Sequence, residues 1–151
     1  MIIEVKAERT YPVIIDSSWK SELAKLLAGR NKAAIIVSEK MQGSIKDLIA
    51  TEAEVLVFPI PDGEPGKSSA TLNKIWDWLG AAGFTRSDLI IGIGGGAVTD
   101  FAGFAAASWL RGIDWVAIPT TVAGAVDAAI GGKTAINSEY GKNLIGAFHS
   151  P

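Results

Sequence analysis

Three consecutive glycines with an aspartate shortly after them are the strongest chemical signal in the sequence. Gly94, Gly95 and Gly96 follow an apolar run that ends at Ile93, and Asp100 falls in the first turn of the helix expected next. Glycines let a backbone approach a ligand closely, and a helix start offers free N–H groups and a positive dipole end. This turn is predicted to bind a phosphate or pyrophosphate, with Asp100 receiving ribose or amide hydrogen bonds. The alternatives are a plain tight turn and an acid that only complements the helix dipole.

The same segment satisfies the pattern G-x-G-x-x-G/A of dinucleotide-binding turns through Gly92, Gly94 and Ala97. The ordinary form places this turn after the first strand of the fold, with an acid at the end of the next strand. Here the turn follows a late strand, and the next strand leads into Thr120 and Thr121. The ordinary fingerprint is therefore not met, and the two hydroxyls either face a ligand or cap a helix.

A second group of chemically useful residues lies in the glycine-rich stretch 122–151. Lys133 follows two glycines there, and Lys142 and Asn143 follow another. A lysine flanked by glycines reaches phosphates and oxyanions, but a Walker loop is excluded because Asp127 stands where that pattern needs glycine. Each lysine alone would be an ordinary surface charge. Together with the aspartate and the asparagine, the two lysines predict a polar site.

The composition excludes several classes of protein. The 151 residues are 48% apolar with a net charge of -2, which fits one globular domain and gives no global attraction to nucleic acid or an anionic membrane. With no cysteine and one histidine, His149, neither disulfides nor a metal site within this sequence is expected. The N-terminus alternates like a strand, not a signal peptide, and no apolar run reaches the roughly 18 residues of a membrane span. A soluble, cytoplasmic protein is expected.

Helical patterns alternate with short, continuous apolar strands along the chain. The spacing predicts helices over 18–28, 44–50, 69–82 and 97–110, and strands over 2–7, 11–15, 33–37, 54–58, 88–93 and 113–118. This order predicts a Rossmann-like α/β fold, in which helices cover both faces of a mainly parallel sheet. The loops that start at Ser38, Asp62, Gly94 and Thr120 should then meet at one edge. Residues 122–151 show no clear periodicity and are expected to form a long loop, which is either functional or leads into a further domain.

Six motifs occur together, in order, between residues 62 and 148 of the sequence. They are Asp62-Gly63-Glu64 with Lys67, Gly94-Gly95-Gly96 with Asp100, Leu110-Arg111-Gly112, Pro119-Thr120-Thr121, Val126 to Thr134, and Gly141 to Phe148. This combination closely resembles the 3-dehydroquinate synthase family over nearly the whole chain. The resemblance implies an enzyme of the shikimate pathway to chorismate and the aromatic amino acids. It would convert 3-deoxy-arabino-heptulosonate 7-phosphate to 3-dehydroquinate and phosphate, with catalytic NAD and a divalent metal, zinc or cobalt.

The resemblance also implies roles for individual residues. Contacts to NAD are implied for Glu39, Asp62, Gly63, Glu64, Lys67, Gly94, Gly95, Gly96, Asp100, Thr120, Thr121 and Lys142. Substrate-binding or catalytic roles are implied for Asp127, Lys133, Lys142, Asn143 and Arg111, the last acting from the partner subunit of a homodimer. The family's metal ligands, one glutamate and two histidines, lie in a helical C-terminal domain, which is expected beyond Pro151. Residues 1–151 are thus expected to be an NAD-binding domain that is inactive alone, with 122–151 as its substrate-binding tail.

The sequence departs from the family pattern at Thr99, at Pro65-Gly66 and at Ser38-Glu39, where the expected ribose contact is affected, and three alternatives remain. Thr99 stands where the family usually has glycine and is expected to narrow the phosphate loop, and Pro65-Gly66 is expected to alter the stiffness of its own loop. The alternatives are a related cyclase of the valiolone or aminocyclitol type, a metal-dependent alcohol dehydrogenase, and a non-catalytic NAD-binding module. The dehydrogenases share the glycine loop and the Pro-Thr-Thr motif but differ in the sequence that follows.

Overall fold

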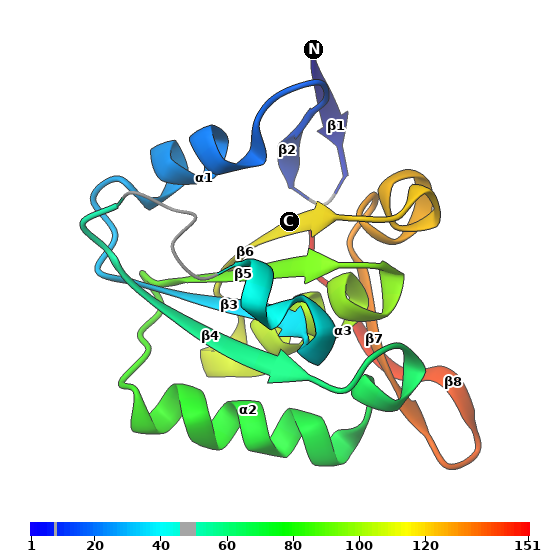
Figure 1. Cartoon of the computed structure of the whole chain (residues 1–151). Helices are drawn as coiled ribbons and strands as arrows, with labels where there is room; N and C mark the ends of the chain where they lie inside the picture. Colours follow the sequence, from blue (N-terminus) through cyan, green and yellow to red (C-terminus); the bar gives the residue numbers. More distant parts are fainter. Residues whose placement is uncertain (8, 46–50) are drawn as a thin grey trace.

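The computed structural model describes residues 1–7, 9–45 and 51–151 (Figure 1). The strands are β1 (Ile2–Lys6), β2 (Thr10–Ile14), β3 (Lys32–Ser38), β4 (Glu54–Ile60), β5 (Leu89–Gly94), β6 (Asp114–Pro119), β7 (Lys133–Ser138) and β8 (Gly141–Phe148). The α-helices are α1 (Trp19–Leu27), α2 (Ser69–Ala81) and α3 (Gly96–Ser108). Shorter 3₁₀ helices cover Glu39–Ser44, Glu64–Gly66 and Trp109–Arg111, and a π-helical turn covers Gly124–Ala128. No helix in these ranges is both long enough and apolar enough to cross a membrane.

A four-stranded parallel sheet in the order β4-β3-β5-β6 forms the centre of the molecule. All six residues of β5 are buried, as expected of an apolar strand covered on both faces. Helix α1 covers one face, where Leu23 and Leu27 pack against Ile35 and Ile91. Helices α2 and α3 cover the other face (Figure 1). The predicted α/β sheet with helices on both faces is therefore confirmed.

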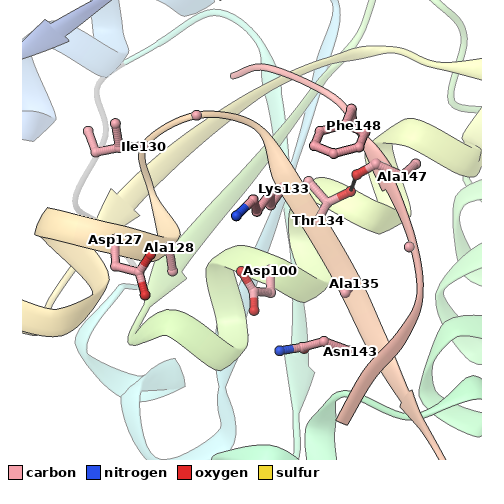
Figure 2. A pocket seen from close by; sticks show the side chains of 12 residues that line it. Asp100, Asp127, Ala128, Ile130, Lys133, Thr134, Ala135, Asn143, Ala147 and Phe148 are labelled. Carbon is pink, nitrogen blue, oxygen red and sulfur yellow. Dashed lines mark hydrogen bonds between the residues drawn. The ribbon is translucent and has the colours of Figure 1, made fainter.

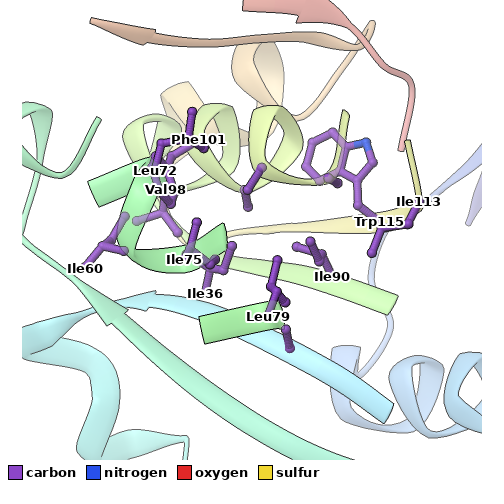
Figure 3. Close-up of a cluster of buried hydrophobic side chains, with 14 of the residues drawn as sticks. Ile36, Ile60, Leu72, Ile75, Leu79, Ile90, Val98, Phe101, Ile113 and Trp115 are labelled. Carbon is purple, nitrogen blue, oxygen red and sulfur yellow. The ribbon is translucent and has the colours of Figure 1, made fainter. Parts of the chain in front are cut away.

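The core between the sheet and helices α2 and α3 fixes where α3 begins (Figure 3). Phe101 of α3, Ile75 of α2 and Ile90 of β5 are each fully buried there. Burying a side chain of this size stabilises the fold by about 1.5–3 kcal/mol. Ser68 caps α2 by accepting a hydrogen bond from the Thr71 N–H at 3.2 Å. Because Phe101 of α3 packs in the same core as Ile90 of β5, the start of α3 is held at the carboxyl end of β5.

Strand β4 forms one edge of this sheet and contains Pro59. The N–H of Glu54 donates to the Asn31 carbonyl at 2.9 Å. Because N–H groups alternate in direction along a strand, every second residue of β4 after Glu54 directs its N–H toward β3. Pro59 falls in the other set, on the open side of the strand.

The glycine-rich stretch is more ordered than its sequence predicts. Residues 122–151 do not form a long loop, because β7 and β8 pair as an antiparallel hairpin with an irregularity between Ile136 and Ser138. The hairpin packs on α3 at Gly103, where an added Cβ would lie 2.4 Å from Thr134 Cγ2. Most residues of β8 are exposed, so the strand carries no apolar alternation that a pattern search would detect.

Two predicted helices differ from the observed ones. The helix expected over 97–110 ends at Ser108, because Leu110 and Arg111 adopt left-handed backbone angles, with φ of 48° and 66°. The helix expected over 44–50 falls mostly outside the described residues. The described segment just before it, Glu39–Ser44, is a 3₁₀ helix.

The first two strands form a separate antiparallel hairpin above the main sheet (Figure 1). Within β1 and β2, Tyr11 is the one buried residue, at 6% exposure. The hairpin is therefore anchored to the rest of the protein chiefly through this side chain.

Candidate functional site

The carboxyl edge of the parallel sheet gathers the loops that the sequence predicted to meet there. The Thr120 N–H donates to the Gly94 carbonyl at 2.9 Å, which joins the ends of β6 and β5. Lys40 Nζ lies 3.6 Å from Asp62 Oδ2, which joins the loops after β3 and β4. This expectation is confirmed.

The glycine turn allows close backbone packing at the start of α3. A Cβ on Gly94 would lie 2.6 Å from Val98, so this position requires glycine. A Cβ on Gly96 would lie 3.3 Å from Ala128 Cβ, and one on Gly95 would lie 3.4 Å from Thr121. Without side chains at these positions, other groups can come close to the backbone N–H groups where the helix begins. A helix start that follows such a glycine turn fits an anionic group such as a pyrophosphate.

The structure resolves two expectations about threonines near this turn. Thr121 Oγ1 accepts a hydrogen bond from the Gly124 N–H at 3.1 Å, so the capping interpretation holds for Thr121. Thr99 is fully buried, and its hydroxyl donates to the Gly96 carbonyl at 3.1 Å. The expectation that Thr99 narrows the phosphate loop is wrong, because its side chain points into the protein.

A buried lysine connects the two groups of residues that the sequence singled out. Lys67 is 2% exposed, and its Nζ donates to Asp100 Oδ2 at 2.6 Å and to Asn143 Oδ1 at 2.5 Å. Burial raises the pKa of the Asp100 carboxyl, although the charge of Lys67 opposes that shift. Asn143 adopts a left-handed backbone with φ of 59° and meets Lys67 through its side-chain oxygen. The sequence marked all three residues but not their contact, because they are 33 and 76 positions apart.

A second, more exposed network lies outside the buried lysine. Asn137 Nδ2 donates to Glu64 Oε2 at 2.7 Å, and Asn137 Oδ1 accepts from the Asn143 N–H at 3.0 Å. Lys142 Nζ lies 3.9 Å from Glu64 Oε1. The hydrogen bond from Asn137 lowers the pKa of Glu64, and the charges of Lys67 and Lys142 act in the same direction. Lys142 thus lies at the rim of the site, next to the loop after β4.

A cleft of about 720 Å³ opens between α3, the π-helical turn and the β7–β8 hairpin. Asp100, Asp127, Lys133 and Asn143 line it, together with apolar groups such as Phe148. In Figure 2 these polar side chains come from different elements and converge on the same space. Carboxylates accept hydrogen bonds from hydroxyls, whereas an ammonium group binds anions. The cleft therefore suits a ligand that carries both hydroxyls and acidic groups.

The remaining predicted residues lie around or away from this cleft. Glu39 is exposed at the start of its 3₁₀ helix, and Gly63 has φ of 67° with open space where a side chain would lie. Arg111 is exposed just before β6, at the amino ends of the parallel strands, whereas Asp100 lies at their carboxyl ends. Arg111 does not line the cleft. Within the described ranges, no group of three or more His, Cys, Asp or Glu side chains could hold a metal ion. A metal site therefore does not fit the described residues.

One contact with the wall of the cleft lay beyond the reach of sequence reasoning. Tyr11 Oη accepts a hydrogen bond from the Gly131 N–H at 2.7 Å, and Gly131 lines the cleft. The two residues are 120 positions apart, and Tyr11 sits in a strand with no motif around it. No local pattern indicates such a contact.

Comparison with known proteins agrees with this geometry. Residues 57–151 match the family model described as 3-dehydroquinate synthase N-terminal. The chain belongs to the 3-dehydroquinate synthase family. A 3-dehydroquinate synthase from Mycolicibacterium vanbaalenii is 47% identical over 99% of this chain, and one from Mycobacterium leprae is 44% identical over the same share. The chain spans less than half of these relatives, 43% and 42% of their lengths.

Solved structures of related cyclases share the fold of this family member. A 2-deoxy-scyllo-inosose synthase complexed with carbaglucose-6-phosphate, NAD⁺ and Co²⁺ superposes with a TM-score of 0.87 and 25% identity, over 100% of this chain and 43% of that one. A 2-epi-5-epi-valiolone synthase from Streptomyces hygroscopicus with NAD⁺ and Zn²⁺ bound gives 0.83 and 28%, over 98% and 43%. The family and fold predicted from the sequence are therefore confirmed.

Proposed function

We propose that this chain is the NAD-binding part of a 3-dehydroquinate synthase, which converts 3-deoxy-arabino-heptulosonate 7-phosphate to 3-dehydroquinate and phosphate. One observation carries the proposal beyond family membership. Asp100, which follows the glycine turn in α3, and the lysine-bearing hairpin line one cleft, and Lys67 joins the two through Asp100 and Asn143. A cofactor on the turn and a sugar acid on the hairpin would thus lie next to each other.

On the cofactor side, Gly95 and Gly96 would receive the pyrophosphate of NAD at the start of α3. Lys67 occupies Asp100 Oδ2, which leaves Oδ1 to accept a hydrogen bond from a ribose hydroxyl or an amide. Glu64 and Thr120 lie on the neighbouring loops at the same edge of the sheet. When bound, NAD supplies a hydride acceptor for a substrate hydroxyl.

On the substrate side, the hairpin offers complementary groups to a phosphorylated sugar acid. Lys67 occupies the Asn143 side-chain oxygen, so the amide NH₂ of Asn143 is left as a donor for the ligand. The Lys133 ammonium would bind a carboxylate or phosphate, and the Asp127 carboxylate would accept hydrogen bonds from ring hydroxyls. Lys142, at the rim beside Glu64, would lie between cofactor and substrate.

The proposal extends to a longer polypeptide. We place the zinc or cobalt ligands, one glutamate and two histidines, in a helical domain beyond Pro151, and we derive no step through that metal. Exposed apolar side chains around the cleft support a covering domain, because patches of this kind mark interaction surfaces. They include Val122 at 81%, Val126 at 73% and Phe148 at 74% exposure.

The proposal also covers assembly and location. We infer a homodimer in the cytoplasm, in which Arg111 reaches the substrate phosphate in the partner's site. Its exposure at the opposite edge of the sheet supports a role outside its own cleft. The absence of cysteine fits a reducing compartment.

Two substitutions in the full-length enzyme test the division of roles. Asp100→Asn should raise the Kd for NAD by roughly 10- to 100-fold, because a hydrogen bond to a charged group is lost. Lys133→Ala should lower turnover by roughly 100-fold and leave the Kd for NAD within about twofold of the wild-type value. Calorimetry measures the first quantity and phosphate release measures the second. The matched controls are Asp77→Asn and Lys74→Ala, which change exposed residues of α2.

Comparison with the control variants and identification of the reaction product show whether the proposal is contradicted. If Asp100→Asn binds NAD like the Asp77 control, Asp100 does not belong to the cofactor site. If Lys133→Ala loses NAD affinity and keeps turnover, the two roles are reversed. Mass spectrometry of the product distinguishes 3-dehydroquinate from the products of the valiolone and inosose cyclases, which share the fold.

A further inference from the structure

The turn that leads into Lys133 is built from two glycines in conformations that other residues rarely adopt. Gly131 has φ of 95° and Gly132 has φ of 82°. Such residues have many alternative conformations in a free chain, so a fixed turn of this kind needs external contacts. The turn matters because Lys133 follows at once and lines the cleft.

The second glycine of this turn is held from the C-terminal side. The Gly132 carbonyl accepts a hydrogen bond from the His149 N–H at 2.8 Å. A Cβ on Gly132 would lie 2.9 Å from the backbone of Ser150, so the two segments are in close contact. These contacts leave the first glycine to be fixed by something else.

Tyr11 supplies that contact. Its Oη accepts a hydrogen bond from the Gly131 N–H at 2.7 Å, and its ring is buried to 6% exposure. A buried aromatic ring has a defined position, so its hydroxyl defines the position of the glycine N–H in turn. The main anchor of the β1–β2 hairpin therefore ends at the wall of the cleft.

Lys133 depends on its backbone for its position. Among the described residues, no ion pair or side-chain hydrogen bond involves the Lys133 ammonium. Its Cα is paired with Phe148 across the hairpin. A shift of the preceding turn would therefore move the ammonium without opposition from any side-chain partner.

From this geometry we infer that Tyr11 is a positioning residue for Lys133, and so for the acidic group of the substrate. This inference rests on the proposed function of the cleft. It assigns a role in substrate binding to the N-terminal hairpin, which lies outside the residues matched by the family model. Tyr11 itself does not line the cleft and acts only through Gly131.

Tyr11→Phe in the intact enzyme tests the inference, because it keeps the ring and removes only the hydroxyl. The KM for the sugar-phosphate substrate should rise by about three- to tenfold, which is the range for one lost hydrogen bond. The kcat and the Kd for NAD should change by less than about twofold. A merely structural role would instead lower the folded fraction, which reduces kcat and leaves KM unchanged.

The sequence offers a matched control in its other tyrosine, Tyr140. This residue is 86% exposed at the tip of the β7–β8 hairpin. Tyr140→Phe makes the same chemical change and should match the wild-type enzyme in KM, kcat and NAD affinity. Equal kinetics of the two variants would overturn the role of Tyr11.

Hydrogen exchange keeps the inference testable if the proposed function fails. Exchange of the backbone amides of Gly131 to Lys133, measured by mass spectrometry, should be at least about fivefold faster in Tyr11→Phe than in Tyr140→Phe. Unchanged exchange would show that Tyr11 does not fix the turn, whatever the ligand is. An enzyme that binds no NAD and turns over no substrate would contradict the proposed function instead.

Discussion

Lys67 lies behind one wall of the cleft, where it contacts Asp100, and Lys133 lies on the other wall; the two lysines are held in opposite ways. Lys67 is 2% exposed and donates to two side chains, whereas Lys133 is exposed and only its backbone is fixed. A buried, doubly bonded ammonium has one position, but an exposed one retains rotamer freedom. The wall next to the sheet is therefore organised before any ligand binds. On the hairpin wall, Lys133 keeps rotamer freedom that a bound ligand would remove.

The largest expected effect comes from breaking the organised wall. Lys67→Met keeps the length of the side chain but leaves the half-buried Asp100 carboxylate without its cation. Removing one partner of a buried pair costs about 3–5 kcal/mol, and the 19% exposure of Asp100 reduces this to roughly 2–4 kcal/mol. Denaturant unfolding would measure the loss of stability.

Two further variants show whether this loss belongs to the buried pair. Lys25→Met removes an exposed ion pair with Glu22 and should leave stability unchanged. The double variant Lys67→Met with Asp100→Asn should recover part of the loss, because the unpaired charge is gone. If Lys67→Met is as stable as Lys25→Met, the two walls do not differ as described.

An intermediate effect should follow from disturbing the hairpin wall. A Cβ at Gly103 would lie 2.4 Å from Thr134 Cγ2 and 2.8 Å from the Trp115 ring, so Gly103→Ala forces β7 away from α3. Overpacking of this kind destabilises by about 1–3 kcal/mol. Thermal unfolding should show the loss.

A second helical glycine provides the control for that measurement. Gly80 in α2 has only Trp109 near its added Cβ, at an ordinary 3.5 Å. Gly80→Ala should be neutral or stabilise by up to about 1 kcal/mol, through higher helix propensity. Equal stability of the two variants would mean that the hairpin moves without cost.

The smallest expected effect is a pH dependence with opposite signs on two carboxylates. Burial raises the pKa of Asp100 above its ordinary value of 3.8. The contribution of Asp100 to stability is therefore present below pH 3.8 and is lost as the pH rises through the pKa of the folded state. The Asn137 hydrogen bond lowers the pKa of Glu64 below 4.5. The contribution of Glu64 to stability is therefore present above pH 4.5 and is lost as the pH falls through the pKa of the folded state.

Unfolding free energies measured between about pH 3 and 6 would check both signs. Asp100→Asn should make the slope of stability against pH more positive, because it removes a group that loses stability with rising pH. Glu64→Gln should make the slope less positive. The same slope change in both variants would contradict the assignment.

The sequence predicted the parallel sheet well because its signals are local. The continuous apolar runs that became β3 and β5, and the glycine break before α3, each occupy a few adjacent residues. The capping hydrogen bond of Thr121 is also local, because its donor, the Gly124 N–H, is only three residues away. Local patterns of this kind determine where elements begin and end.

The hairpin and its contacts could not be predicted in the same way. Strand β8 is mostly exposed, so no periodicity distinguished it from a loop. The contacts of Lys67 with Asn143 and of Tyr11 with Gly131 join residues 76 and 120 positions apart. Such pairs depend on the completed fold, and only the identity of the residues, not their partners, is visible in the sequence.

Pro59 gives the open side of β4 a resistance to self-association. If a strand of another molecule paired with this edge, its carbonyl groups would need a backbone N–H donor at every second residue of β4. Pro59 belongs to the set that faces outward and has no N–H, so the incoming carbonyl would stay unpaired there. The sheet is thereby discouraged from growing into aggregates at that edge, close to the loop that the proposed cofactor would contact.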